Sequence, residues 1–451
     1  MKSVLFRMLG FLLAAALLVC GAGVAAAEEN LFEYRVLEDG TAMLTGYKGS
    51  GADLILPASV DGHTVTGLSK SFGYNTPCVK DLRTVSVPDT VTEIEPGAFM
   101  FAEYLEGIRI AEGNPALVFT DGVLYNKEKQ SLMLYLRTNA AGHFDVPEGI
   151  RGIEDKAFVR ARLVSLSLPE SMECIGRESF DQCSFLEEIS LPEGLKFIGA
   201  DAFDNCDRLH RITIPAGVTD IEEAAFTDNR LREIRVAPGN EVFAVSGGAL
   251  VNIRDGVLIA YPTQAEAESC AVAEGVKRIG RFAFYRAHHL KQISLPEGLL
   301  EIGRGAFVSC DHLTGIDLPD SVTTLEKMAF EGNSDAKRLH LPAGLTAITE
   351  NFDGIGVETL EIPETVTSVE KSFRSLRNLK EVVLPGSLES VGGNAFAFCR
   401  NLESVTIPAG VREIRCDFTG CAEALVIRVE AGSFAEAYCK EHQLNYRVIA
   451  E

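Results

Sequence analysis

The side chains that could do chemistry are cysteines, histidines and carboxylates, and their spacing points away from catalysis. The eight histidines are scattered, and the adjacent pair His288 and His289 lacks the further ligands that a zinc site needs. Carboxylates such as Glu148 and Glu193 recur at predicted turns, where water solvates them. A catalytic carboxylate pair needs one member whose environment perturbs its pKa, and the sequence shows no such asymmetry. We therefore predict a protein that is not an enzyme and that uses no metal or cofactor.

Five cysteines share one position of a repeated pattern, three residues after a phenylalanine: Cys183, Cys206, Cys310, Cys399 and Cys421. Free cysteine behaves as a small buried side chain, so we interpret this column as core. Disulfides stay open as an alternative, because Cys183 with Cys206, and Cys399 with Cys421, would lie in neighbouring coils. Coils about 4.8 Å apart bring the Cα atoms within reach of a bridge. The absence of a C-x-x-C motif argues against a zinc knuckle or a redox centre.

These residues belong to a repeat that runs through most of the chain. Two consecutive copies begin at Leu186 and Leu209 and share the pattern L-x-x-I-x-L-P, a turn, V-x-x-I and A-F. Within a run, copies follow one another every 21 to 23 residues. The last two apolar residues of L-x-x-I-x-L point to one side of a strand, and the proline ends that strand because it has no N–H. One coil cannot bury these side chains alone, so neighbouring coils must stack and cover them.

The sequence therefore predicts a repeat solenoid, a β-rich leucine-rich-repeat superhelix with a parallel sheet on one face and about 14 coils. Two units are longer than the rest, with inserts at about 111–146 and 237–273, and the inserts contain related segments that begin at Asn114 and Asn240. Each insert holds apolar runs separated by polar residues, which is typical of a hairpin. The inserts concentrate Tyr and Phe, so they are either a recognition feature or an extension of the core.

The ends of the chain differ from the repeats. Lys2 and Arg7 precede an apolar run that closes with small residues at Ala27, which is the pattern of a cleaved secretory signal peptide. An uncleaved anchor is the alternative, since the run is long enough to cross a membrane. We predict four segments, namely the signal peptide, a divergent N-terminal cap with the first repeat, the leucine-rich repeats, and a C-terminal cap: 1–27, 28–81, 82–424 and 425–451.

The units from Leu82 to about Cys421 resemble the BspA-like family of bacterial leucine-rich-repeat proteins. The A-F ending and the proline at the end of the strand carry the resemblance, which covers about three quarters of the chain. The resemblance implies a secreted or cell-surface solenoid, of a kind often implicated in adhesion to host or neighbouring-cell proteins. We therefore expect an extracellular or cell-surface protein as the partner.

Charge narrows the class of partner further. The chain has 42 Lys and Arg against 64 Asp and Glu, a net charge of −22, which argues against nucleic acid and against an anionic membrane surface. The residues that flank the Ile of L-x-x-I-x-L point outward, and there basic and acidic side chains are balanced. These positions hold no aromatic residue, so we do not expect a platform that stacks on sugars. A face that is merely solvated is the alternative interpretation.

We predict that this neutral strand face binds the partner, with arginines as anchors because their planar fork makes several hydrogen bonds at once. The candidate binding residues are Arg211, Arg232, Arg235, Lys291, Lys337, Arg338 and His340. A passive structural spacer or envelope component is one alternative function, and a secreted hydrolase with an unrecognised carboxylate site is a second. We further expect a monomer that binds no nucleic acid and does not insert into a membrane once its signal is cleaved.

Overall fold

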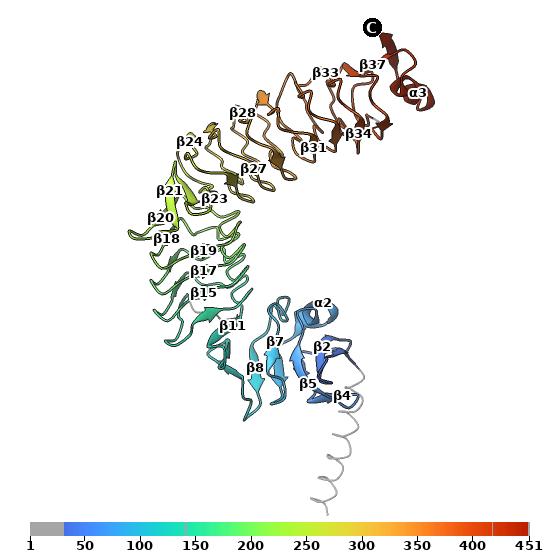
Figure 1. Ribbon diagram of the computed structural model, residues 1–451. Coiled ribbons are helices and arrows are strands. Elements are labelled where there is room, and N and C mark those ends of the chain that lie inside the picture. Colours follow the sequence, from blue (N-terminus) through green and yellow to red (C-terminus); the bar gives the residue numbers. More distant parts are fainter. Residues whose placement is uncertain (1–30, 140–141, 417, 450–451) are drawn as a thin grey trace, which may run out of the picture.

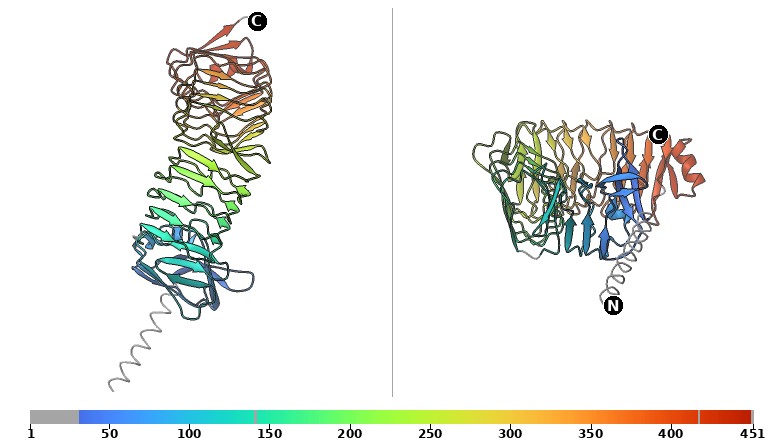
Figure 2. Two further views of the ribbon diagram at one scale, coloured as in Figure 1. Left: turned by 90° about the vertical axis from the view of Figure 1, so that its left-hand side faces the viewer. Right: turned by 90° about the horizontal axis from the view of Figure 1, so that it is seen from below.

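A computed structural model describes residues 31–139, 142–416 and 418–449. These residues form an arc-shaped solenoid of about 18 turns (Figure 1). The coils follow one another along one continuous axis (Figure 2). The predicted solenoid with parallel strand pairing is confirmed, although the number of turns is larger than the 14 that the sequence indicated. The predicted signal peptide, residues 1–27, lies outside the described residues.

The L-x-x-I-x-L segments form a set of parallel strands that we call the outer ribbon. It follows the convex side of the arc, as β28 and β33 do in the C-terminal half (Figure 1). Its strands are β3 (Asp53–Ile55), β6 (Thr84–Val87), β8 (Gly107–Ile110), β12 (His143–Asp145), β14 (Ser165–Ser167), β16 (Glu188–Ser190), β18 (Arg211–Ile214), β20 (Glu233–Val236), β24 (Ser269–Ala271), β26 (Gln292–Ser294), β28 (Gly315–Asp317), β30 (Arg338–His340), β33 (Glu381–Val383), β35 (Ser404–Ile407), β37 (Val426–Glu430) and β38 (Tyr446–Ile449). They pair in parallel, but only in short sheets of two to four strands.

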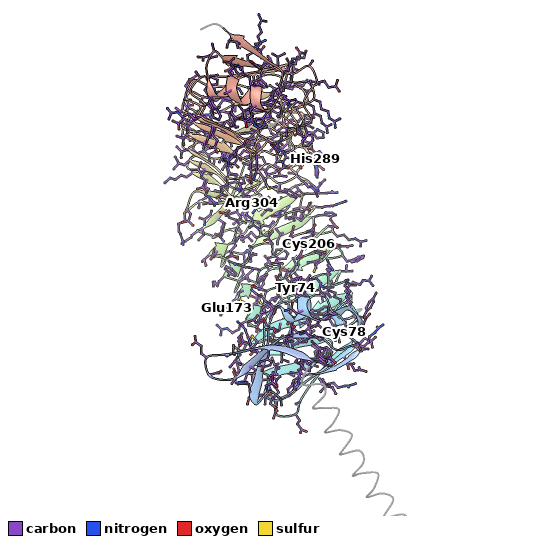
Figure 3. The ribbon with its side chains drawn as sticks, turned by 90° about the vertical axis from the view of Figure 1, so that its right-hand side faces the viewer. Tyr74, Cys78, Glu173, Cys206, His289 and Arg304 are labelled. Atoms are coloured by element: carbon purple, nitrogen blue, oxygen red, sulfur yellow. The ribbon has the colours of Figure 1, made fainter. Side chains whose placement is uncertain are left out.

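The V-x-x-I segments form a second set of parallel strands, the inner ribbon, where the sequence indicated only a returning chain. Its strands are β7 (Glu93–Ile94), β11 (Ser131–Tyr135), β13 (Gly152–Ile153), β15 (Cys174–Ile175), β17 (Phe197–Ile198), β19 (Asp220–Ile221), β23 (Val257–Ala260), β25 (Arg278–Ile279), β27 (Glu301–Ile302), β29 (Thr324–Leu325), β31 (Ala347–Thr349), β32 (Ser368–Glu370), β34 (Ser390–Gly392) and β36 (Glu413–Ile414). Figure 3 shows the molecule from this concave side, with Glu173 and Arg304 labelled beside β15 and β27.

The curvature of the arc explains why the two ribbons differ in continuity. On the concave side the coils stay close, and up to five consecutive strands of the inner ribbon pair in one sheet. On the convex side the same coils spread apart, while strand pairing requires a spacing of about 4.8 Å. The outer ribbon therefore breaks into short sheets wherever this spacing is exceeded.

The two inserts are antiparallel hairpins, as predicted. In the first, β9 (Leu117–Thr120) pairs with β10 (Val123–Asn126), and β10 pairs with β11, which then joins the inner ribbon. In the second, β21 (Phe243–Ser246) and β22 (Ala249–Asn252) lead into β23 in the same way. The aromatic residues at their ends, Tyr135 and Tyr261, are buried, which favours the interpretation that the inserts extend the core.

Small elements cover the two ends of the stack. The C-terminal helix has Ser433 as its N-cap, as its sequence suggested, and the Ser433 hydroxyl accepts a hydrogen bond of 3.1 Å from the Glu436 amide. The remaining elements, in chain order, are β1 (Phe32–Val36), β2 (Ala42–Tyr47), β4 (Ser59–Val60), β5 (His63–Leu68), α2 (Phe72–Asn75), the 3-10 helix η1 (Val79–Asp81) and α3 (Phe434–Glu441).

The phenylalanines of the A-F pairs form a stacked column between the two ribbons. Successive rings lie 4.8 to 5.9 Å apart between centroids and within 25° of parallel. The column runs in two parts, and each part begins with the tyrosine that ends an insert, Tyr135 on Phe158 and Tyr261 on Phe284. The inserts thus divide one column of the repeat into two stacks.

Candidate functional site

The outer face of coils β12 to β20 presents two rows of outward side chains. They stand on strands whose alternate residues, such as Leu166 and Ile212, are buried in the core. The row before the central apolar residue consists of His143, Ser165, Glu188, Arg211 and Glu233. The row after it consists of Asp145, Ser167, Ser190, Thr213 and Arg235. Acidic, basic and hydroxyl groups therefore share one rigid face, as the sequence indicated.

A groove of about 1150 Å³ lies on this face, lined by residues from His143 to Ala237. It is centred on a break in the outer ribbon, because β16 pairs only with β14, and β18 pairs only with β20. Behind the break, β17 and β19 of the inner ribbon remain paired. The groove is thus the place where the curvature of the arc separates two neighbouring coils on their outer side alone.

A small hydrogen-bond network occupies one end of the groove. The His143 ring lies 2.7 Å from the Ser165 hydroxyl through Nδ1, and 3.0 Å from Asp145 Oδ1 through Nε2. Hydrogen bonds from Ser167, and then from His143, lower the pKa of the Asp145 carboxyl. These are the groups of a hydrolytic triad, but the His143 and Asp145 side chains are 51% and 75% exposed. Water reaches half or more of each of these two side chains, so the network is a solvated cluster on the surface.

The structure separates the seven predicted binding residues into two groups. Arg211 and Arg232 line the groove, and Arg235 stands beside it on β20. The other four lie beyond the second insert, on β30 and beside β26 and β30: Lys291, Lys337, Arg338 and His340. All seven side chains are exposed, but only Arg211 and Arg232 line the groove.

Acidic neighbours already pair with five of the seven predicted residues. Glu233 Oε2 lies 3.3 Å from Arg211 Nε and 2.8 Å from Arg235 Nη2. The corresponding pairs on the second group are Lys291 with Glu268, Arg338 with Asp317, and His340 with Asp320. Within the described part of the chain, Arg232 and Lys337 have no acidic partner. Whether these seven residues bind a partner stays a prediction.

Sequence reasoning did not single out the groove residues Glu188, Ser190, Thr213 and His143. Their outward orientation could be read from the strand period. The sequence could not show that they line a groove, because the groove depends on a break between β16 and β18. Both strands belong to units whose sequence follows the ordinary repeat. The arc's curvature, which accumulates over many coils, produces the break.

The cysteine column is part of the core, as predicted, and it also makes hydrogen bonds. Each thiol donates to the backbone oxygen of a phenylalanine in the preceding coil, for example Cys206 to Phe180 at 3.3 Å and Cys310 to Phe284 at 2.9 Å. Asn333 takes the same place in its coil, with Nδ2 donating to the Phe307 oxygen at 2.9 Å.

The two disulfides that the sequence left open do not form. The thiols of Cys183, Cys206, Cys399 and Cys421 all donate to backbone oxygens and are not bridged. Burial raises the pKa of Cys183 and Cys310 to about 12, so these thiols stay protonated and unreactive at neutral pH. Cys206, labelled in Figure 3, belongs to this column.

Carboxylates cluster on the ridge that follows the phenylalanine column. Asp204 Oδ1 is buried, and the described residues give it no hydrogen-bond partner. Burial, together with repulsion from Asp181, Asp201 and Asp228, raises the pKa of Asp204 to about 7. In the part of the chain that the structure describes, no three His, Cys, Asp or Glu side chains are placed to hold a metal ion. The cluster is therefore a source of electrostatic strain.

Asp204→Asn is expected to flatten the dependence of stability on pH. The folded chain holds the Asp204 proton up to about pH 7, whereas the unfolded chain loses it near pH 4. The folded state binds more protons in this window, so Asp204 makes stability fall as the pH rises from about 4 to about 7. The substitution should leave the free energy of unfolding unchanged near pH 4. Near pH 8 it should raise that free energy by about 1–2 kcal/mol, a value reduced for partial exposure.

Urea titrations of wild type and variant at both pH values test this expectation. Asp207→Asn is the control, because Asp207 lies in the same coil but is exposed. An unchanged pH slope in Asp204→Asn would contradict the assignment of strain to this carboxyl.

Over the described ranges, the structure contains no helix with the length and apolar character needed to cross a membrane. No curated protein matches the chain significantly. The chain is similar to several solved bacterial repeat structures. The pneumococcal vaccine antigen PcpA is 20% identical, with a TM-score of 0.52 over 93% of this chain and 97% of that chain.

Two further structures are similar at lower TM-scores. A leucine-rich cell surface protein from Faecalibacterium prausnitzii is 22% identical, covers 90% of this chain and 95% of its own, and has a TM-score of 0.43. A leucine-rich-repeat protein from Bacteroides ovatus is 20% identical, with coverages of 93% and 98% and a TM-score of 0.42. At these identities the likenesses show the fold alone.

The family assignment rests on the sequence of the repeats. The pattern described as "BspA type Leucine rich repeat region (6 copies)" matches residues 136–245, 260–373 and 349–430, which together make up more than half of the chain. The match confirms the resemblance inferred from the A-F ending and the strand-terminal proline. The chain belongs to the BspA-type leucine-rich-repeat family.

Proposed function

We propose that this chain is a secreted or cell-surface protein that binds another protein through the outer face of coils β12 to β20. The observation that carries the proposal is the groove of about 1150 Å³ on a rigid face whose charged and hydroxyl side chains point outward. Family membership and the likeness to a pneumococcal vaccine antigen support a protein exposed outside the cell. Adhesion to host or neighbouring cells is the biological role that we propose for this binding.

The chemistry of the face favours a protein partner over other ligands. The chain carries a net charge of −22, whereas the groove is lined by three arginines and three glutamates, so a neutral or acidic partner meets the least repulsion there. Arginine is enriched among residues that dominate protein interfaces. Strands fix the positions of these side chains, which lowers the entropic cost of ordering them on binding.

The double substitution Arg211→Glu with Arg232→Glu is expected to weaken partner binding at least tenfold, a loss of about 1.4 kcal/mol or more. Both side chains are exposed, so the fold should persist, and Glu233 keeps Arg235 as its ion-pair partner. The mature chain serves as bait against extracellular-matrix and cell-surface proteins, and the affinity of each partner is then measured for both proteins.

Arg109→Glu with Lys380→Glu is the matched control, because it makes the same change in charge on the outer ribbon, on β8 and beside β33, but outside the groove and at residues that are not among the seven candidates. Binding that survives only in the control supports the proposal. Equal losses in both variants would indicate nonspecific electrostatics and contradict it. A chain that recovers no partner at all would favour the passive spacer.

A further inference from the structure

We infer that the groove takes an extended segment of the partner in which one acidic and one basic side chain lie three or four residues apart. The inference rests on the proposed function and specifies the chemistry of the partner. It follows from which groove side chains are already paired and from the geometry of those that are not.

Most of the charge in and around the groove is neutralised within the chain. Glu187 Oε1 lies 3.0 Å from Arg208 Nη1, and Glu233 pairs with both Arg211 and Arg235. The Glu187–Arg208 and Arg211–Glu233 pairs each join two neighbouring coils, and the Arg235–Glu233 pair lies within β20. A ligand charge would have to compete with an existing partner at each of them.

Glu188 and Arg232 differ from the other charged residues of the groove. Both are exposed and line the groove, and the described residues place no opposite charge within ion-pair distance of either. Glu193 also lines the groove without an ion pair, but its carboxylate accepts a hydrogen bond of 3.2 Å from the Ala216 amide. Among the described groove residues, Glu188 and Arg232 are therefore the anion and the cation whose charged groups have neither an ion pair nor a hydrogen bond. A ligand that supplies a cation at Glu188 and an anion at Arg232 would form two ion pairs without breaking any.

The spacing of these two charges selects an extended ligand. Glu188 begins β16, and Arg232 immediately precedes β20, so the two residues are separated by two coils. Two paired coil spacings amount to about 10 Å, and the unpaired step between β16 and β18 makes this distance longer. Because an extended chain rises about 3.3 Å per residue, the matching charges of a ligand lie three or four residues apart.

The surface beside these charges suits a main chain. The hydroxyls of Ser190 and Thr213 point outward on β16 and β18, and no described residue hydrogen-bonds to either. A hydroxyl both donates and accepts, so it can bind either a peptide N–H or a carbonyl oxygen. Ile189 and Leu191 are only partly buried beside the ribbon break, which gives an apolar side chain a place to pack.

A displayed library of random peptides, selected on the full mature chain, tests the inference. We expect peptides with one acidic and one basic residue three or four positions apart. Glu188→Arg should shift the selection to peptides with two acidic residues at this spacing, and Arg232→Glu should shift it to two basic residues. Lys380→Glu, which precedes β33 as Arg232 precedes β20 but lies outside the groove, should leave the selected motif unchanged. The affinity of a wild-type-selected peptide should fall at least tenfold in either groove variant.

Two results would overturn the inference. One is a selection that lacks the charge pair, and the other is a charge pair that both groove variants retain. A third outcome is that Arg211→Glu with Arg232→Glu abolishes binding of the whole partner while the library yields no peptide. This outcome would show that the partner presents a folded surface to the groove. That result leaves the proposed function standing and rejects the extended segment alone.

Discussion

Phe203→Ala is expected to lower the free energy of unfolding by about 3–5 kcal/mol, the usual cost of deleting a buried aromatic ring. The Phe203 side chain is 0% exposed and lies between two parallel neighbours, with ring centroids 5.2 Å from Phe180 and 5.7 Å from Phe226. The hole would open inside a continuous stack, where the backbone of each coil is fixed by strands on both ribbons. Little collapse is therefore available to fill it.

Chemical denaturation of the mature chain measures this loss. Phe185→Ala is the matched control, because Phe185 is in the preceding coil but is 42% exposed and packs against Arg208 on the surface. We expect the control to cost less than about 1 kcal/mol. Because coils contact only their neighbours, Phe203→Ala should unfold the middle coils before the rest. Equal stability of the two variants would show that the phenylalanine column is not core.

The sequence was sufficient to predict the features that depend on the repeat. Each unit places its Leu, Ile and Phe at fixed offsets, so columns of like residues were predictable without any knowledge of the coil's path. Phe203 and Phe307 are fully buried, as this logic requires. The cysteine column was also recognisable, because a small residue recurs at one offset from the phenylalanine.

The inner ribbon was not predictable in the same way. Its strands are mostly two residues long, as in β17 (Phe197–Ile198), which is too short for any alternation of apolar and polar residues to show. They are strands only because the neighbouring coil supplies a partner, for example Ile198 opposite Ile221. A pattern read within one unit cannot reveal pairing that exists only between units.

The candidate site was predictable only in part. The strand period showed that Arg211, Arg232 and Arg235 point outward, and they do. It could not show that Glu233 holds two of them, since one pair lies within a strand and the other joins two coils. Nor could it show the groove, which depends on the curvature of the whole arc. Free charges such as Glu188 emerge only after all ion pairs are known.

The asparagine that recurs at the start of both inserts has a structural role. Asn114 and Asn240 precede the hairpins, and each side chain bridges two coils in the same way. Asn114 Nδ2 donates to the oxygens of Pro88 at 3.0 Å and Val91 at 2.8 Å. Its Oδ1 accepts from the amides of Ala116 at 3.1 Å and Leu117 at 2.8 Å.

Asn240 makes the equivalent four bonds, with its Nδ2 2.8 Å from the Pro215 oxygen and its Oδ1 2.7 Å from the Phe243 amide. One amide side chain thus ties the turn of the preceding coil to the first strand of the insert. This arrangement needs both a donor and an acceptor on the same short side chain, which only Asn provides at this length.

Asn114→Ala is therefore expected to lower the free energy of unfolding by about 2–4 kcal/mol, because it leaves buried backbone donors and acceptors without partners. Asn114 is only 4% exposed, so water cannot readily replace the lost bonds. Asn114→Asp should cost at least as much as Asn114→Ala at neutral pH, since it places a buried carboxylate oxygen against the Pro88 and Val91 oxygens.

Asn401→Ala is the control, because Asn401 is exposed and its side chain makes one hydrogen bond, to the Arg377 oxygen at 2.6 Å. We expect it to cost no more than about 1 kcal/mol in the same urea titration. The difference between the two losses in the free energy of unfolding gives the contribution of the buried hydrogen bonds, because the general cost of replacing Asn by Ala cancels. If Asn114→Ala unfolded at the same urea concentration as Asn401→Ala, the hairpin would be held by its apolar strands alone, and the recurrence of Asn at both inserts would lack this structural cause.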